Sequence, residues 1–189
     1  MNNAHSFPAP EGLAAQVARI DRPLVLVGLM GVGKSTIGRR LAQVLARSFV
    51  DTDEEIERAA NRSIAEIFAA HGEAYFRDGE RRVIARLIAE GHGVIATGGG
   101  AFADDETRAL VLDEGLAIWL DCDLDTLVER TARKNTRPLL ATGDPREILR
   151  DLKERRSTAY AEAQVHVVTD HVPHDTTVAR ILEALAAWQ

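Results

Sequence analysis

Residues 24–36 read LVLVGLMGVGKST, and this stretch decides the fold. Its first four residues are aliphatic, a run typical of a short strand buried on both faces. Gly28 to Ser35 then match Gly-x-x-x-x-Gly-Lys-Ser/Thr, the pattern of a phosphate-binding loop. Apolar residues at helical spacing follow at Ile37, Leu41 and Val44. The loop therefore joins a predicted strand to a predicted helix, which is the context that the pattern requires.

The residues of this loop suit a nucleotide triphosphate. Glycines let backbone N–H groups turn inward around phosphate oxygens, and the helix N-terminus adds the positive end of its dipole. Lys34 has the length to reach the β and γ phosphates, and the Ser35 hydroxyl is an oxygen ligand of the kind that Mg²⁺ prefers. The alternative is a glycine-rich turn with an incidental lysine. The loop alone predicts nucleotide binding and does not specify a kinase.

Outward from the loop, short apolar runs alternate with longer amphipathic stretches. The predicted strands are 24–27, 49–50, 94–96, 116–120 and 165–168. The predicted helices are 35–47, 56–60, 64–70, 73–90, 107–113, 124–133, 146–162 and 176–188. This alternation indicates an α/β fold, a parallel sheet covered by helices. We expect one domain over residues 21–189, preceded by a flexible extension, 1–20, with room for a short helix near 14–20.

Composition excludes several classes of protein. No apolar run approaches the roughly 18 residues of a membrane span, and the first 16 residues lack the basic and apolar sequence of a secretory leader. The net charge of −6 argues against general nucleic-acid binding. Cys122 is the only cysteine, which suits a reducing cytoplasm. We therefore expect a cytoplasmic protein with small-molecule partners, and a monomer because no extra apolar face is visible.

Two carboxylates follow the second predicted strand. Asp51 and Asp53 lie at the edge where open α/β sheets bind ligands. Asp51 would hold Mg²⁺ through water, and Asp53 would accept a hydrogen bond from an acceptor hydroxyl. Asp53 also precedes a helical stretch, so an N-cap role is the competing interpretation and is compatible with the first.

Further candidates lie after the third strand and on two helices. Gly98-Gly99-Gly100 is typical of a close approach between backbone and ligand, or else of a flexible loop. Arg77 and Arg156 have the fork geometry that clamps a carboxylate. The alternative for Arg77 is an ion pair with Glu73 or Glu80 at helical spacing.

A local basic cluster stands out in this acidic chain. It consists of Arg130, Arg133, Lys134 and Arg137, and the stretch 134–146 also carries Pro and Gly. This composition favours a mobile lid that brings a cation over the phosphates, with a solvated basic loop as the alternative.

Together these residues resemble the shikimate kinase family, a nucleoside-monophosphate-kinase-like group of phosphate-loop proteins. The resemblance covers the chain from about Leu24 to the last helix. The motifs that carry it are the phosphate loop Gly28 to Thr36, Asp51-Thr52-Asp53, Gly72-Glu73-Ala74-Tyr75-Phe76-Arg77, Gly98-Gly99-Gly100 and Arg137-Pro138-Leu139. Each motif except the first is weak alone, but five in the right order are specific.

The resemblance implies a three-layer fold with a five-stranded parallel sheet in the order 2-3-1-4-5, and a substrate-binding region near 53–80. It implies transfer of the γ-phosphoryl group of ATP, with Mg²⁺, to a hydroxyl of shikimate, with Lys34, Asp53 and Arg137 as catalytic residues. The implied ATP-binding residues are Gly31, Val32, Gly33, Lys34, Ser35, Thr36, Arg130 and Arg137. The implied shikimate-binding residues are Asp53, Arg77, Gly98, Gly99, Gly100 and Arg156, and the metal residues are Ser35 and Asp51.

The chain departs from the family pattern at two places. Ser157-Thr158-Ala159 replaces x-Pro-Leu between Arg156 and Tyr160, although the spacing is kept. Residues 169–174 read TDHVPH where the family often supplies a basic residue to the adenine pocket.

Other functions remain open on the residues alone. Another small-metabolite kinase, acting on gluconate or a nucleotide, is the nearest alternative, and the carboxylate pair with Arg77 favours a polyhydroxylated carboxylate over a base. A GTP-dependent switch is disfavoured because Asn-Lys-x-Asp and Asp-x-x-Gly are missing from the sequence. A non-catalytic nucleotide-binding module is disfavoured by the intact Lys34, Ser35 and Asp51.

Overall fold

Five parallel strands form one sheet in the order β2-β3-β1-β4-β5. The protein is represented by a computed structural model that describes residues 11–132 and 143–188. The central strand β1 pairs with β3 on one side and β4 on the other, with Leu24 level with Val94 and with Leu116. The strands are β1 (Leu24–Val27), β2 (Phe49–Asp51), β3 (Val94–Ala96), β4 (Leu116–Asp121) and β5 (Val165–Val168). The predicted fold class and strand order are confirmed.

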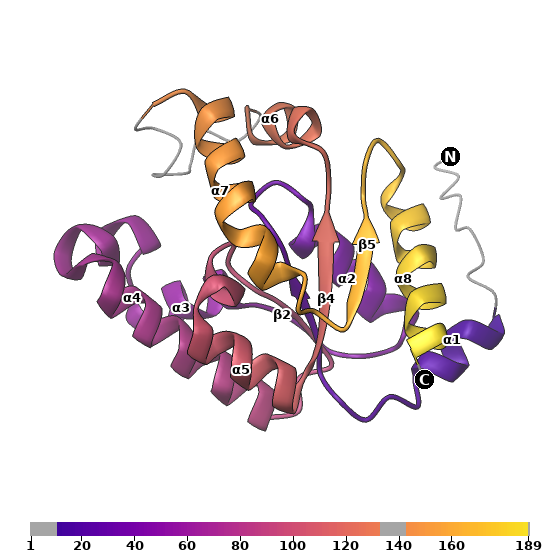
Figure 1. Cartoon of the computed structure of the whole chain (residues 1–189). Coiled ribbons are helices and arrows are strands. Elements are labelled where there is room, and N and C mark those ends of the chain that lie inside the picture. The colour runs from indigo at the N-terminus through magenta and orange to yellow at the C-terminus, as the bar shows by residue number, and fades with distance from the viewer. Residues whose placement is uncertain (1–10, 133–142, 189) are drawn as a thin grey trace, which may run out of the picture.

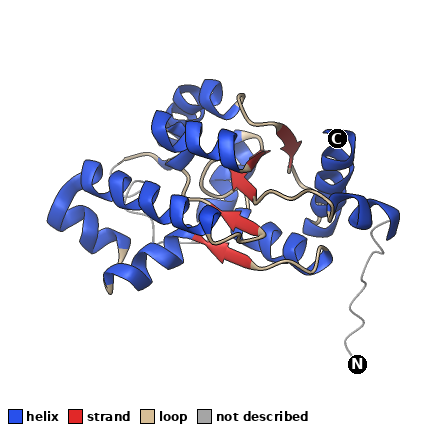
Figure 2. Cartoon of the chain, turned by 90° about the horizontal axis from the view of Figure 1, so that it is seen from below, coloured by secondary structure: helices blue, strands red, loops and turns tan. Residues whose placement is uncertain are grey.

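Helices connect the strands and cover both faces of the sheet, as the view along the strands shows (Figure 2). In Figure 1, α5 and α7 lie in front of the sheet and α2 lies behind it. The helices after β1 and before the C-terminus are α2 (Lys34–Val44), α3 (Thr52–Ala60), α4 (Ile64–Ala89), α5 (Asp105–Glu114), α6 (Leu124–Ala132), α7 (Pro145–Tyr160) and α8 (His174–Trp188), with a 3₁₀ turn η1 (Ala101–Ala103).

The hydrophobic core lies between the sheet and these helices. All four residues of β1 are buried, as the continuous aliphatic run predicts for a central parallel strand. A second, smaller apolar cluster of Ile56, Ile67 and Phe76 lies between α3 and α4, outside the sheet. The region between β2 and β3 therefore has a small core of its own.

The long helix α4 is broken once, at Gly72. The glycine has φ 79° and ψ 178°, which is a conformation that essentially only glycine adopts. Ser63 begins α4 with a capping box, because its hydroxyl accepts from the N–H of Glu66 while the Glu66 side chain accepts from the N–H of Ser63. The predicted helices 64–70 and 73–90 are thus two segments of one kinked helix.

The N-terminal part differs from the prediction. Residues 11–20 were expected to belong to a flexible extension, but Glu11–Val17 forms helix α1, which packs against α8. Val17 and Ile20 are buried in the main core. The short helix expected near residues 14–20 is thus present, but it spans Glu11–Val17. Its partner α8 lies at the other end of the chain.

The predicted lid, 134–146, is described only at its end. Helix α7 begins at Pro145, with Asp144 as its N-cap, so residues 145 and 146 are helical and not part of a loop. Residues 133–142, with Arg133, Lys134 and Arg137, lie outside the described residues. Among the helices of residues 11–132 and 143–188, none combines the length and the apolar character needed to cross a bilayer.

Candidate active site

The phosphate loop lies at the carboxyl end of the central strand. Gly28, Gly31 and Gly33 have φ values of 133°, 90° and 100°, which side chains disfavour. A Cβ on Gly28 would also collide with the backbone carbonyl of Leu120. The glycines therefore allow the loop to turn beside β4 and to end at the first residue of α2. The Nζ atom of Lys34 donates to the carbonyls of Gly28 and Leu29 at 2.7 and 2.9 Å, which holds it across the loop.

Ser35 and Asp51 meet at the start of α2 and the end of β2. The Ser35 hydroxyl donates to Oδ2 of Asp51 at 2.5 Å. The other oxygen of Asp51 accepts from the N–H of Asp53 at 3.0 Å, so Asp51 is the N-cap of α3. The N-cap interpretation of Asp53 was wrong because α3 begins one residue earlier, at Thr52. Ser35 and Asp51 together offer two oxygen ligands, a donor set that fits Mg²⁺ held mainly by phosphates and water.

Asp53 lies in the first turn of α3 and faces the glycine turn, which consists of residues 98–100. Its Oδ1 atom is 2.9 Å from the position that a Cβ on Gly98 would take. Burial, followed by the negative charges of Asp51 and Glu57, raises its pKa, against the opposing effects of Lys34 and Arg77. The carboxyl group is thus free of the capping role and available to a hydroxyl in the cleft.

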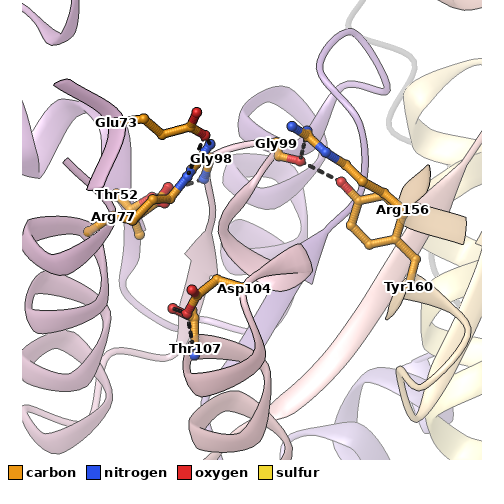
Figure 3. Close-up of polar contacts among 10 residues, drawn as sticks. Thr52, Glu73, Arg77, Gly98, Gly99, Asp104, Thr107, Arg156 and Tyr160 are labelled. Carbon is orange, nitrogen blue, oxygen red and sulfur yellow. Dashed lines mark hydrogen bonds and ion pairs between the residues drawn. The ribbon is translucent and has the colours of Figure 1, made fainter. Parts of the chain in front are cut away.

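Arg77 pairs with both of its predicted carboxylates and also lies against Gly100. Figure 3 shows its pair with Glu73. Its Nη1 atom is 2.6 Å from Oε2 of Glu80, and its Nη2 atom is 3.2 Å from Oε1 of Glu73. A Cβ on Gly100 would collide with the guanidinium group. The ion pairs therefore do not compete with a site role for Arg77, because they fix its guanidinium beside the turn.

The glycine turn contacts three other parts of the site. The N–H of Gly98 donates to the Thr52 hydroxyl at 3.1 Å. A Cβ on Gly99 would lie 3.0 Å from the backbone nitrogen of Met30 in the phosphate loop. The absence of side chains at 98–100 thus allows close approach to the phosphate loop and to α3, which the interpretation as a merely flexible loop does not explain. The predicted approach to a ligand stays a prediction.

Arg156 reaches this turn from α7. Its Nη1 atom donates to the carbonyl of Gly99 at 2.7 Å, and the hydroxyl of Tyr160 donates to the same oxygen (Figure 3). The neighbouring Arg155 is exposed and pairs with Asp151 at 2.9 Å instead. The two adjacent arginines therefore point to different environments, and only Arg156 faces the site.

Arg130 lies on the other side of the phosphate loop. Its guanidinium donates to the carbonyl of Val32 at 3.3 Å and to the carbonyl of Thr169 at 3.0 Å. It thus bridges the loop and the segment after β5.

These elements surround a cleft of about 930 Å³. The predicted residues that line it are Gly31, Gly33, Lys34, Ser35, Thr36, Asp51, Asp53, Gly99 and Arg130. The predicted residues Gly98, Gly100, Arg77 and Arg156 are not among the lining residues, although Arg77 lies against Gly100 and Arg156 donates to Gly99. Val32 is buried, and Arg137 lies outside the described residues. Glu57, Ser63, Ile64 and Ala65 also line the cleft, inside the predicted region 53–80.

Sequence reasoning missed the functional setting of Glu80 and Tyr160. Glu80 was considered only as a surface partner of Arg77, yet its side chain is 1% exposed. The spacing of Tyr160, one helical turn after Arg156, was the available signal for a residue on the same face of α7.

The chain is similar to known proteins over most of its length. The shikimate kinase family model matches residues 30–186. The shikimate kinase of Novosphingobium aromaticivorans is 60% identical over 174 residues, which are 90% of each protein, and that of Caulobacter vibrioides is 57% identical over 87% of this chain and 82% of its own.

Solved structures agree with these sequence matches. The shikimate kinase of Acinetobacter baumannii in complex with shikimate has a TM-score of 0.84 at 36% identity, covering 88% of this chain and 93% of its own. The shikimate kinase of Aquifex aeolicus has a TM-score of 0.76 at 34% identity, covering 86% and 95%. A gluconokinase of Sinorhizobium meliloti, with a TM-score of 0.63 at 19% identity over 89% and 94%, shares the fold alone. By its sequence matches and its fold, the chain belongs to the shikimate kinase family.

Proposed function

We propose that this protein transfers the γ-phosphoryl group of ATP to the 3-hydroxyl of shikimate, giving shikimate 3-phosphate and ADP in aromatic amino-acid biosynthesis. One observation carries the proposal: Asp53 lies in the same cleft as Lys34 and Ser35 of the phosphate loop, and Arg77 and Arg156 contact the glycines at 98–100 beside it. A general base, a phosphate cradle and a carboxylate clamp are the parts that this reaction needs.

On the nucleotide side, residues 31–36 bind the phosphates through backbone N–H groups. The Nζ atom of Lys34 donates to phosphate oxygens in place of the carbonyls of Gly28 and Leu29. Ser35 would ligate Mg²⁺, and Asp51 would hold it through a water. When bound, this ion neutralises charge that develops on the phosphoryl oxygens. Arg130 flanks the adenine, a role supported by its position between the phosphate loop and Thr169.

On the acceptor side, Arg77 and Arg156 bind the carboxylate of shikimate, and residues 98–100 bind it through their backbone. Asp53 accepts hydrogen bonds from the ring hydroxyls. The preorganisation of Arg77 by Glu73 and Glu80 supports its role, because a guanidinium that is already oriented loses less entropy on binding.

Positioning and charge neutralisation supply most of the catalysis, because the transition state of phosphoryl transfer is loose. Asp53 orients the attacking hydroxyl and takes its proton. Lys34 and the loop N–H groups stabilise the transferring group. Arg137 adds a further positive charge from the stretch 134–146. Closure of this stretch excludes water, and its opening limits turnover. A turnover rate that does not change with solvent viscosity would contradict the role of opening.

The test is release of ADP with Mg-ATP and four acceptor conditions: shikimate, gluconate, AMP and none. We expect turnover with shikimate alone, and its loss in Asp53→Asn. Turnover with gluconate would keep the mechanism and change the substrate. ATP binding without acceptor-dependent turnover would identify a non-catalytic nucleotide-binding module.

We also propose a cytoplasmic monomer. The free thiol of Cys122 and the need for ATP support the compartment. The chain has a mass of 20.6 kDa. A mass of twice this value, measured by light scattering, would contradict the monomer.

A further inference from the structure

The carbonyl of Gly99 receives two hydrogen bonds from one face of α7. Arg156 donates to it at 2.7 Å, and Tyr160, four residues later, donates from its hydroxyl (Figure 3). A carbonyl oxygen has two lone pairs, so both bonds form at once. The glycine turn is thus tied to α7 through one atom.

The two donors differ in how firmly they are held. The ring of Tyr160 is 2% exposed and is stacked between Trp119 and Phe102, with centroid distances of 5.9 and 6.4 Å. Burial raises the pKa of its hydroxyl to about 12, against the opposing charge of Arg156, so the proton that it donates is retained at neutral pH. Tyr160 is therefore a fixed donor.

Arg156 is the less constrained of the two. Its guanidinium is partly exposed, and among residues 11–132 and 143–188 it pairs with no carboxylate, unlike Arg77 and Arg155. Its guanidinium donates to the neutral carbonyl of Gly99 rather than to a carboxylate. An incoming anion will compete successfully for this guanidinium, because a charge-assisted bond is about twice as strong as a neutral one.

We infer that Tyr160 is a positioning residue that keeps hold of the Gly99 carbonyl while Arg156 turns from that carbonyl to the carboxylate of the acceptor. The inference rests on the proposed function. With Tyr160 in place, the Gly99 carbonyl keeps one hydrogen-bond donor after Arg156 has turned away. With phenylalanine in its place, the departure of Arg156 leaves the carbonyl unpaired, and binding of the acceptor bears that cost.

The Gly99 carbonyl matters because of what the turn touches. Gly99 lies against Met30 of the phosphate loop, and Gly98 is bonded to Thr52 beside Asp53. A turn that loosens on acceptor binding would shift the surface on which the carboxylate and the hydroxyls are placed. Tyr160 thus preserves the distance between the acceptor and the phosphates.

The test is a double-mutant cycle of Tyr160→Phe and Arg156→Ala, with Arg155→Ala as the matched control. We expect Tyr160→Phe to raise the shikimate Kd and KM on the order of tenfold, with little change in kcat and in the KM for ATP. In the Arg156→Ala background, Tyr160→Phe should alter the shikimate Kd less than about twofold, because no arginine then leaves the Gly99 carbonyl when the acceptor binds. Arg155→Ala should match the unmodified protein.

Thermal unfolding separates this role from a purely structural one. Ligand-free Tyr160→Phe keeps the bond from Arg156, so its Tm should change less than the rise in Tm that shikimate induces, and that rise should be smaller than in the unmodified protein. An equal loss of affinity in both backgrounds, or a fall in kcat together with both KM values, would overturn the inference alone. Failure of the unmodified protein to bind shikimate would overturn the proposed function and the inference with it.

Discussion

Glu80 holds Arg77 through one carboxylate oxygen and leaves the other oxygen unpaired. Oε2 lies 2.6 Å from Nη1 of Arg77, whereas Oε1 is buried and accepts no hydrogen bond from any residue that the structure describes. Burial raises the pKa of Glu80, and the positive charge of Arg77 opposes this effect. A buried carboxylate with an unpaired oxygen weakens the fold, so its presence here indicates a role in placing the arginine.

Glu80→Gln should therefore weaken binding of shikimate without unfolding the protein. The amide keeps the shape of the side chain but loses the charge-assisted bond, so we expect the KM for shikimate to rise about three- to tenfold, with the KM for ATP unchanged. Glu73→Gln is the control, since Glu73 is an exposed partner of the same arginine and should change the KM less than about twofold. Equal effects of the two variants would refute the role given to Glu80.

The pH dependence of turnover should report Asp53. Since burial and nearby carboxylates raise its pKa, the acid limb of kcat/KM for shikimate should have its midpoint above about 3.9, the usual value for aspartate, with activity lost as pH falls. Asp53→Asn should lower kcat by about 10²- to 10⁴-fold. A residual activity in this variant that keeps the same acid limb would assign the limb to another group.

Asp53 should also affect stability, and in the opposite sense to activity: lowering the pH should reduce turnover but remove the destabilisation caused by the buried charge of Asp53. A carboxyl whose pKa is raised on folding contributes stability below its unfolded pKa, and this contribution is lost as pH rises through the folded pKa. Asp53→Asn should therefore unfold at a higher temperature than the unmodified protein at pH 7, and the difference should shrink at acid pH. Calorimetry at several pH values checks this, and a lower Tm at neutral pH would contradict it.

Asp51→Asn should separate metal binding from helix capping. Asparagine caps helices as well as aspartate does, so α3 should remain intact and the Tm should change little. The loss of a negative charge beside Ser35 should raise the Mg²⁺ concentration needed for half-maximal activity about tenfold or more. A titration of activity with MgCl₂ at saturating ATP measures the shift. An unchanged requirement would remove Asp51 from the metal site.

Gly72→Ala should destabilise the protein through the backbone alone. No atom lies within 4 Å of the place where its Cβ would stand, but the backbone conformation excludes other residues, so the free energy of unfolding should fall by about 1–3 kcal/mol. Gly79→Ala is the matched control in the same helix. It also has open space around its Cβ, and its helical backbone should make alanine neutral or stabilising by about 0.5–1 kcal/mol. Urea unfolding of both variants measures the contrast, and similar values for the two would show that the kink is not held by glycine.

The sequence predicted the sheet well because its signals are local. The aliphatic run of residues 24–27 and the glycines after it define a buried strand and its turn without knowledge of the rest of the chain. Capping of α3 was considered for Asp53 as the competing interpretation and belongs to Asp51, a difference of the size expected at helix ends.

Long-range contacts were harder to predict. Helix α1 is recognisable only once α8 is present to bury Val17, and Tyr160 acquires its role only through Gly99, which is 61 residues away in the chain. The two interpretations of Arg77, ion pair or site residue, were not separable from the sequence, because its ion pairs also place the guanidinium beside Gly100.

The small apolar cluster of Ile56, Ile67 and Phe76 gives residues 52–89 a packing centre apart from the main core. This one continuous stretch between β2 and β3 carries Asp53 and Arg77, packs partly around its own centre, and leaves the phosphate loop on a different strand. A graft of the corresponding stretch from a kinase of the same fold would therefore replace Asp53 and Arg77 together while keeping the phosphate loop, the glycines at 98–100 and Arg156.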